Sequence, residues 1–291
     1  MPSTLAKSLF WILFSLVLGE ASADNRIDIA GSGSDVILIP DLASDGAALQ
    51  PIAQHLGHCH RTHTFTLAGF VNQPAFEGPV LNSWIASITR YIEALDSHRA
   101  TLVGHGLGGA LALKIALEQP EKVTQLIILD SLPFLPAFDS PGATVEEAKL
   151  QAQASRQRML DASEDTFRAS QQQALSTLTS QSDRVAALLA WSMASDRKTM
   201  ADAHYQMFIT DLRDDVAQIR APTLVLVPWD VSQPEDTATT LDLYRKQYAK
   251  LSGAQVKLVK GSRHFLTFDQ PIATNWAIDE FLGKCPSGSA D

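Results

Sequence analysis

The stretch Thr101-Leu-Val-Gly-His-Gly-Leu-Gly-Gly109 decides the fold of this chain. An apolar run over residues 100–103 leads into it, and a helix-forming pattern follows over residues 109–118 and stops before Pro120. This order predicts a strand, a sharp turn and a helix, which is the local context of a nucleophile elbow. The centre of the turn is Gly106, and we expect it to have a positive or otherwise strained φ, which glycine adopts without a Cβ penalty.

The apolar residues on both sides of this stretch follow alternating strand and helix patterns. Short apolar or alternating runs predict strands at residues 27–29, 35–40, 62–67, 125–129, 221–227 and 255–259. Helical spacing predicts helices at residues 46–57, 81–95, 241–251 and 272–282. Strands that alternate with helices predict an α/β fold, with a mostly parallel central sheet and helices on both faces.

The turn resembles the nucleophile elbow of the α/β-hydrolase family, whose usual sequence is Gly-His-Ser-Leu-Gly-Gly. Residues 104–109 match that sequence except at the third position, where Gly106 replaces the nucleophilic serine. The resemblance covers essentially the whole chain after residue 23 and implies the α/β-hydrolase fold with esterase- or lipase-like chemistry. Because glycine carries no hydroxyl, it predicts an esterase-like protein that is weakly active or inactive as it stands.

The resemblance also implies positions for a catalytic base and acid. His264 follows the last predicted strand and precedes an apolar residue and a short helix, where the family has its catalytic histidine. Two carboxylates, Asp130 and Asp230, follow strands in the required chain order. Most family members place the acid near the second position, although the usual spacing would put it at Val231. Both stay candidates. We expect one of them to lie within hydrogen-bond reach of His264, and we expect His264 to face the space above Gly106.

In an active relative, backbone N–H groups at Leu42 and Leu107 would hold the oxyanion. Asp41 stands where the family has a glycine next to this hole. A carboxylate there would oppose the stabilisation of a developing oxyanion. The alternative is that Asp41 points to solvent or caps the next turn.

The composition changes at about Ala137, after which Gln, Ala and Ser become frequent. Helical spacing there predicts helices at residues 144–160, 164–178, 183–193 and 196–208. The resemblance implies a helical lid folded over the site, and the alternative is an irregular helical bulge. The predicted organisation is a signal peptide at 1–23, a first part of the core at 24–138, the lid at 139–216 and a second part of the core at 217–291.

The first 23 residues have the pattern of a secretory signal peptide. Lys7 precedes an apolar run at residues 9–18, and Ala21-Ser22-Ala23 forms a small-residue cleavage site. The run is shorter than the roughly 20 residues of an ordinary membrane span, and an uncleaved anchor is the alternative. We expect a secreted or periplasmic protein without a stable membrane span after cleavage. The net charge of −9 argues against a nucleic-acid partner.

Cys59 and Cys285 are the two cysteines, and an oxidising compartment would permit a disulfide between them. The sequence does not place them within bonding distance of each other. Four histidines and Cys59 lie within residues 55–63, a composition that suits zinc. A helix that ends there and runs into a strand would point these side chains in several directions. We therefore expect no metal and no cofactor.

Three functional hypotheses follow. The chain is an esterase-like hydrolase that has lost its serine, a non-catalytic protein that binds a small apolar or ester-type ligand, or an enzyme in which His264 activates water or abstracts a substrate proton directly. An unsuspected alternative nucleophile such as Ser131 would change this choice. We expect Gly106→Ser to raise esterase activity, and Asp41→Gly to raise it further.

Overall fold

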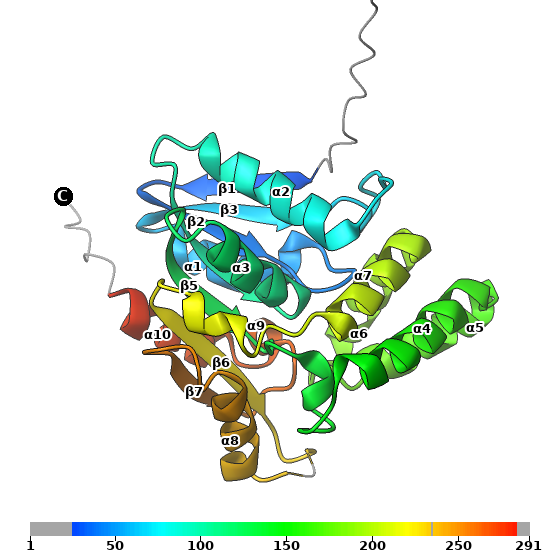
Figure 1. The fold of residues 1–291 in the computed structure, drawn as a ribbon. Coiled ribbons are helices and arrows are strands. Elements are labelled where there is room, and N and C mark those ends of the chain that lie inside the picture. Colours follow the sequence, from blue (N-terminus) through cyan, green and yellow to red (C-terminus); the bar gives the residue numbers. More distant parts are fainter. Residues whose placement is uncertain (1–24, 234, 284–291) are drawn as a thin grey trace, which may run out of the picture.

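The structure, a computed structural model, describes residues 25–233 and 235–283 (Figure 1). Its strands in chain order are β1 (Arg26–Gly31), β2 (Ser34–Ile39), β3 (His60–Thr66), β4 (Ala100–His105), β5 (Val123–Leu129), β6 (Thr223–Trp229) and β7 (Gln255–Lys260). They form one sheet in the order β1-β3-β2-β4-β5-β6-β7. Every pair is parallel except β1 with β3. The predicted mostly parallel sheet is confirmed.

Helices cover both faces of the sheet. They are α1 (Gln50–Leu56), α2 (Val80–Glu93), α3 (Leu107–Glu118), α4 (Val145–Asp161), α5 (Glu164–Leu175), α6 (Ser182–Met193), α7 (Arg197–Ile209), α8 (Thr237–Gln247), α9 (Leu266–Asp269) and α10 (Pro271–Leu282), with short 3₁₀ turns η1 (Gly46–Leu49), η2 (Leu135–Ala137) and η3 (Asp215–Gln218). Helices α2, α3 and α8 cover one face, and α1, α9 and α10 the other.

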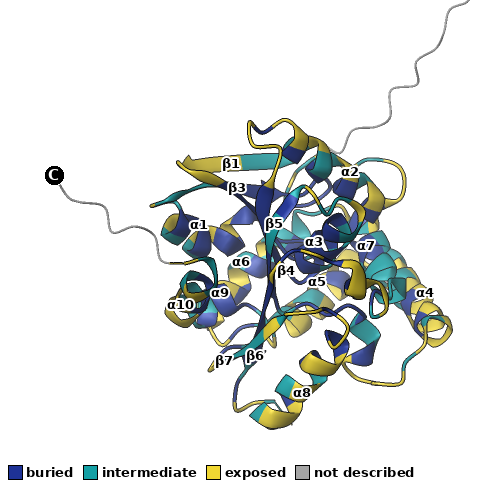
Figure 2. Ribbon diagram, turned by 60° about the vertical axis from the view of Figure 1, so that its left-hand side comes forward, coloured by how far each residue is buried: buried dark blue, intermediate teal, exposed yellow. Residues whose placement is uncertain are grey.

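The core consists of two apolar layers separated by the sheet. Along β2, Ile37 and Ile39 pack into the layer under α2 and α3, while Val36 and Leu38 pack into the layer under α1 and α10. All four are at most 1% exposed. Because side chains alternate across a strand, a strand buried on both faces is apolar at every position. Figure 2 shows these strands buried at the centre, while α4 and α8 expose their outer faces.

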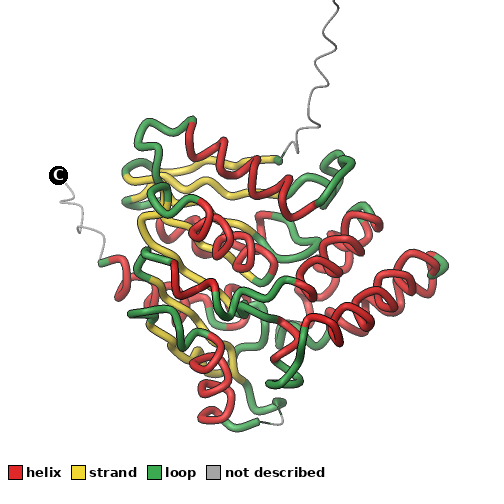
Figure 3. The backbone as a smooth tube through the Cα atoms, viewed as in Figure 1, coloured by secondary structure: helices red, strands yellow, loops and turns green. Residues whose placement is uncertain are grey.

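Four helices, α4 to α7, are inserted between β5 and β6 and stand together beside the sheet (Figure 3). Thr144 and Glu147 form a capping box at the start of α4. Asp196 caps α7, and α4 and α7 pack along each other. Helix α5 ends three residues earlier than predicted, because Ser176 and Thr177 turn their hydroxyls back to carbonyl oxygens of the last turn. The predicted helical insertion is therefore present, and its action as a lid stays a prediction.

The histidines near Cys59 do not converge on a common point. His55 bonds to Asp279 at 2.7 Å, whereas His60 shares a hydrogen bond of 2.8 Å with Ser34. His63 is buried in β3. Within the described residues no cluster of side chains suits a metal ion. The predicted helix end that runs into a strand is confirmed.

Two predictions fall outside the part of the chain that the structure describes. The signal peptide at residues 1–23 lies outside it, and so does Cys285, so the pairing with Cys59 stays a prediction. Over residues 25–233 and 235–283, no helix has the length and apolar character needed to cross a bilayer.

Candidate active site

Gly106 lies at the turn from β4 to α3 with a φ of +50°. The turn is tight because a Cβ added at Gly108 would lie 2.0 Å from the carbonyl oxygen of Ile39, and one at Gly104 would lie 2.3 Å from that of Gly108. Glycine is required at both flanking positions for the strand and the helix to approach this closely. The predicted elbow geometry and the positive φ of Gly106 are confirmed.

Asp41 follows β2 and points its carboxylate into the space above the elbow. A Cβ added at Gly106 would lie 2.0 Å from Asp41 Oδ1. The same oxygen accepts a hydrogen bond of 2.8 Å from the backbone N–H of Leu107, the first residue of α3. The Asp41 side chain is only 12% exposed. The alternative in which Asp41 points to solvent or caps its own next turn is therefore wrong.

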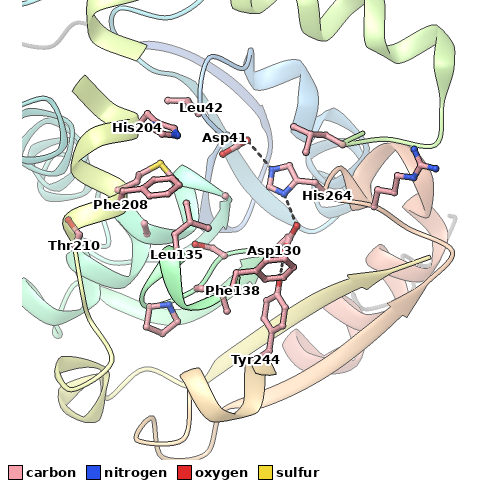
Figure 4. Close-up of a pocket in the computed structure, with 18 of the residues that line it drawn as sticks. Asp41, Leu42, Asp130, Leu135, Phe138, His204, Phe208, Thr210, Tyr244 and His264 are labelled. Atoms are coloured by element: carbon pink, nitrogen blue, oxygen red, sulfur yellow. Dashed lines mark hydrogen bonds and ion pairs between the residues drawn. The ribbon is translucent and has the colours of Figure 1, made fainter. Parts of the chain in front are cut away.

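His264 lies between two carboxylates, as Figure 4 shows. Its Nδ1 bonds to Asp130 Oδ2 at 2.6 Å, and its Nε2 bonds to Asp41 Oδ2 at 2.9 Å. Asp230 bonds instead to Arg263 at 2.7 Å and to the backbone N–H of Ser232 at 2.8 Å. The predicted carboxylate partner of His264 is thus present and is Asp130. Asp230, the alternative candidate, does not bond to the imidazole, because its carboxylate is engaged by the guanidinium of Arg263.

The charges of this cluster stabilise one another. Burial disfavours the charged imidazole, but the negative charge of Asp41 and hydrogen bonds to Asp130 and Asp41 raise the pKa of His264 to about 10. Burial also disfavours the Asp41 carboxylate, yet the positive charge of His264 and its hydrogen bond lower the pKa of Asp41 to about 2. At neutral pH the site holds an imidazolium between two carboxylates. An imidazolium can donate a proton but cannot accept one, which disfavours His264 as the base of the resting protein.

Two further side chains hold the cluster in place. Tyr244, on α8, donates a hydrogen bond to Asp130 Oδ1. His105 donates from Nε2 to the backbone carbonyl of His264 at 2.9 Å. Burial and the nearby positive charge of His264 lower the pKa of His105 to about 4, so this ring is neutral at neutral pH. His105 belongs to the elbow motif, but no sequence signal points to Tyr244, which is one of several apolar and aromatic residues on its helix.

A cavity of about 500 Å³ opens above this cluster. Asp41, Asp130 and His264 line its floor, together with the backbone of Gly106. Its walls are largely apolar and include Leu42, Ala110, Leu132, Pro133, Leu135, Phe138, Leu178, Met207, Phe208 and Leu212. The core, the η2 segment and the helical insertion all contribute to these walls. The arrangement suits a small, largely apolar molecule whose reactive or polar end lies on the floor.

His204, on α7, lines the same cavity and stacks on Phe208 with ring centroids 4.5 Å apart. Within the described residues its Nδ1 is buried without a hydrogen-bond partner. No sequence pattern marks His204 as a site residue. This ring can offer a polar contact in a largely apolar wall.

The two predicted oxyanion-hole residues differ in their surroundings. Leu42 lines the cavity. The N–H of Leu107 donates to Asp41, so in this structure it is not free to hold an oxyanion, and the oxyanion-hole role of both residues stays a prediction. The expected gain from Gly106→Ser alone is also unsupported, because the new Cβ would collide with Asp41 Oδ1. A serine at 106 would require the Asp41 carboxylate to move from its present position.

Comparisons with known proteins agree with this geometry. A profile described as "Alpha/beta hydrolase family" matches residues 30–275. The pimeloyl-[acyl-carrier protein] methyl ester esterase of Aeromonas salmonicida is 36% identical over 114 residues, which are 38% of this chain and 44% of the relative. The N-formylmaleamate deformylase of Pseudomonas putida is 24% identical over 87% of this chain and 90% of the relative. A hydrolase structure from Pseudomonas aeruginosa superposes with a TM-score of 0.74 at 20% identity, covering 91% of this chain and 99% of that one.

The match to the Aeromonas salmonicida esterase spans less than half of that relative's length. The deformylase match extends over nearly the whole of both chains at lower identity. Together with the profile, these matches connect the chain to hydrolases that include esterases.

Proposed function

This chain belongs to the alpha/beta hydrolase family and is related to esterases, and from that premise we propose that it has lost serine-type ester hydrolysis and binds a small, largely apolar molecule above Asp41. One observation carries the proposal. The carboxylate of Asp41 occupies the space that a side chain at residue 106 would need, 2.0 Å from the Cβ position. This contact supports the loss of a serine nucleophile at residue 106, because the space for its side chain is filled.

The same carboxylate engages both groups on which a serine mechanism depends. A serine hydroxyl needs a neutral imidazole to take its proton, and the tetrahedral intermediate needs a free N–H donor. Here His264 and Leu107 both donate hydrogen bonds to Asp41. Restoring the hydroxyl alone would leave both groups occupied. We infer that the loss of serine chemistry involves at least two residues, Gly106 and Asp41.

The cavity supports the binding part of the proposal. Its volume of about 500 Å³ lies within the range of small-molecule sites, and its walls are mainly apolar. The floor combines one imidazolium with two carboxylates, so it has a net negative charge. Arg263 also lines the cavity, but its guanidinium is paired with Asp230 at 2.7 Å, so the floor still disfavours a ligand with an anionic head. We expect a neutral ester-type or similar polar group on an apolar body.

Ester hydrolysis tests the first part. Short-chain p-nitrophenyl esters are offered to the native protein, to Gly106→Ser, and to the double variant Asp41→Gly with Gly106→Ser. The matched control is Asp41→Gly with Gly106→Ala, which has the same cleared space and no hydroxyl. We expect a burst of p-nitrophenolate and fluorophosphonate labelling at residue 106 only in the serine-containing double variant. A burst in the native protein, or labelling of its Ser131, would contradict the proposal.

Binding of a neutral apolar fluorophore, N-phenyl-1-naphthylamine, tests the second part. We expect saturable binding by the native protein. Leu135→Trp narrows the cavity from a half-buried wall position and should weaken that binding by at least tenfold. Leu150→Trp, at an exposed position on α4, is the matched control and should leave it unchanged. Equal binding by all three proteins would show that the fluorophore occupies another surface.

We further propose export of the chain with cleavage after Ala23. The charged start, short apolar run and small-residue site support this proposal. Expression of the full chain in a bacterium, followed by fractionation and N-terminal sequencing, should give a periplasmic or secreted protein that begins at Asp24. Recovery of the uncleaved chain in the membrane fraction would support the anchor instead.

A further inference from the structure

We propose that Asp41 is itself a nucleophile, and that its substrates are small apolar molecules with a strained carbon–oxygen bond, such as epoxides. This inference goes beyond the proposed function, because it assigns a covalent reaction to the group that displaced the serine. It depends on three features of the floor: the orientation of the carboxylate, the proton on His264 and the donor at Leu107.

The Asp41 carboxylate is fixed and can be reached from the cavity. Oδ1 is held by Leu107 N–H at 2.8 Å and Oδ2 by His264 Nε2 at 2.9 Å. These are the hydrogen bonds of the Asp41 side chain among the described residues, one for each carboxylate oxygen. A carboxylate oxygen has two acceptor positions, so each oxygen keeps a lone pair. Because Asp41 lines the cavity, a ligand carbon can approach one of them.

The proton required by a leaving oxygen lies next to the nucleophile. His264 carries Nε2–H toward Asp41 Oδ2, and its Nδ1–H is held by Asp130 at 2.6 Å. Asp130 is fixed in turn by Tyr244. An oxygen that leaves a carbon under attack by Asp41 would therefore be within reach of Nε2–H. This placement favours a substrate whose leaving atom is oxygen over one whose leaving group needs no proton.

The first step forms an ester. An oxygen of Asp41 attacks an epoxide carbon, the carbon–oxygen bond of the ring breaks, and the released oxygen takes the proton from His264 Nε2. The products are a hydroxyalkyl ester of Asp41 and a neutral His264. The negative charge that held the proton on His264 is lost in the same step, so the imidazole becomes able to act as a base.

The second step hydrolyses that ester. Neutral His264 takes a proton from water, and the resulting hydroxide attacks Cγ of Asp41. The oxygen held by Leu107 N–H carries the negative charge of the tetrahedral intermediate, at the N-terminus of α3. The ester bond then breaks, the diol leaves with the proton of the new carboxyl group, and the carboxylate and the imidazolium are restored. The sum is epoxide plus water giving diol, without any other reactant.

The fit between Gly106 and Asp41 supports a replaced nucleophile over a decayed one. Random loss of a serine would leave an empty space above the elbow. Instead, a carboxylate occupies that space and bonds to the two groups that a serine mechanism would use. Asp41 fits there only because residue 106 has no side chain. Each residue is therefore compatible with the other and with little else.

The experiment uses phenyl glycidyl ether, an apolar epoxide, with the full chain. Because His264 is both the acid of the first step and the base of the second, the ester is trapped in the native protein by a rapid acid quench during the first turnover. We expect an adduct of one probe molecule per protein, mapped to Asp41 by mass spectrometry. Asp41→Asn and Asp41→Ala should remove the adduct. Asp139→Asn, which changes an exposed carboxylate near the cavity, is the matched control and should behave as the native protein does.

Single-turnover reaction of the native protein in water enriched in oxygen-18 gives an independent readout. A carboxylate nucleophile predicts a first product with ordinary oxygen, and heavy oxygen in the side chain of Asp41. Heavy oxygen in the first product would mean that water attacks the epoxide directly, and would overturn the proposal. The absence of diol formation together with the absence of any trapped adduct on the native protein would overturn it as well.

These outcomes are distinguishable from a failure of the proposed function. An ester burst or fluorophosphonate labelling of the native protein would show a working serine and would contradict the proposed function. The absence of an adduct at Asp41 would leave the binding function intact and remove only the nucleophile.

Discussion

Strand β2 has a buried aspartate near each end, and each of them bonds to a histidine. At its amino end, Asp35 Oδ1 bonds to His63 Nε2 at 2.9 Å. Beyond its carboxyl end, Asp41 Oδ2 bonds to His264 Nε2 at 2.9 Å. Counted as whole residues, main chain included, both aspartates are at most 9% exposed. Two carboxylate–imidazole contacts of the same length therefore lie near opposite ends of one strand.

Their surroundings differ in charge. Asp35 also accepts hydrogen bonds from Arg61 at 2.7 Å and from Ser97 at 2.9 Å. The other nitrogen of His63 bonds to the hydroxyl of Tyr91. Arginine keeps its charge at every ordinary pH, so Asp35 has a permanent cationic partner. Every group in this network has a fixed protein partner, which is typical of a structural cluster.

In the part of the chain that the structure describes, neither arginine nor lysine bonds to Asp41. Its histidine is shared with a second carboxylate, Asp130, and the group opens onto a cavity of about 500 Å³. The positive charge here depends on one titratable ring. A contact between aspartate and histidine therefore does not identify a site by itself. The second carboxylate and the open cavity mark the Asp41 end as the place where chemistry can occur.

The largest expected difference is in the pH dependence of stability. The pKa of His264 is raised to about 10 in the folded chain, compared with about 6.5 in an unfolded one. The contribution of the protonated His264 ring to stability is fully present below pH 6.5 and is lost as the pH rises through 10. The free energy of unfolding should fall over this range by up to about 1.4 kcal/mol per pH unit. Urea unfolding from pH 6.5 to 9.5 measures the slope.

The variant Asp41→Asn isolates the contribution of His264 to the pH dependence of stability. It removes the negative charge that raises the pKa of His264 most strongly, so the slope should become shallower. Titratable groups that the two proteins share contribute equally to both slopes, so they cancel when one slope is subtracted from the other. NMR titration of the His264 ring should give a pKa several units above 6.5 in the native protein and a lower one in the variant. A native ring that titrates near 6.5 would contradict the imidazolium assignment.

The second prediction compares the two aspartates directly. Asp35→Asn leaves Arg61 and His63 without their anionic partner and should lower the free energy of unfolding by about 2–4 kcal/mol. Asp41→Asn keeps an oxygen for Leu107 N–H and removes a buried charge, so we expect a change below about 1 kcal/mol at pH 6.5. Urea unfolding of both variants decides. Equal losses would mean that both clusters are structural.

The third prediction concerns the elbow. Gly106→Ser should lower the free energy of unfolding by about 1–3 kcal/mol, because a residue with a Cβ must adopt a φ of +50° and displace Asp41. The added change Asp41→Gly should recover part of that loss, because it removes the collision and leaves the backbone strain. Thermal melts of both variants measure the loss and the recovery. No recovery would show that the strain, and not the collision, dominates.

The fold could be predicted because its signals are local. Apolar strands, helical spacing and the small residues of the elbow each depend on a few neighbouring residues. The boundaries were less accurate where a cap was overlooked. Helix α8 begins at Thr237, four residues earlier than expected, because Asp236 accepts a hydrogen bond from the backbone N–H of Thr239.

The site could be predicted only in part, because its partners are distant in sequence. The spacing after the last strand gave His264, but two carboxylates satisfied the same chain order. Only the three-dimensional placement of Arg263 separates Asp230 from the imidazole. Likewise, the resemblance placed Asp41 next to the oxyanion hole but did not predict the direction of its side chain. No local pattern encodes that direction, because it depends on the empty space left by Gly106.

The smallest expected effect is that of Asp230→Asn. Asp230 follows its strand as Asp130 does, yet it bonds to Arg263, which is 28% exposed, and to Ser232. Partly exposed ion pairs contribute about 1 kcal/mol or less, so the free energy of unfolding should change within that limit. The His264 titration should not change, since Asp230 does not contact the ring. Asp130→Asn, by contrast, removes a direct partner of His264 and should lower the pKa of its imidazole. NMR titration of both variants measures the contrast. If Asp230→Asn moved the His264 titration as far as Asp130→Asn does, the two carboxylates would share the role here assigned to Asp130.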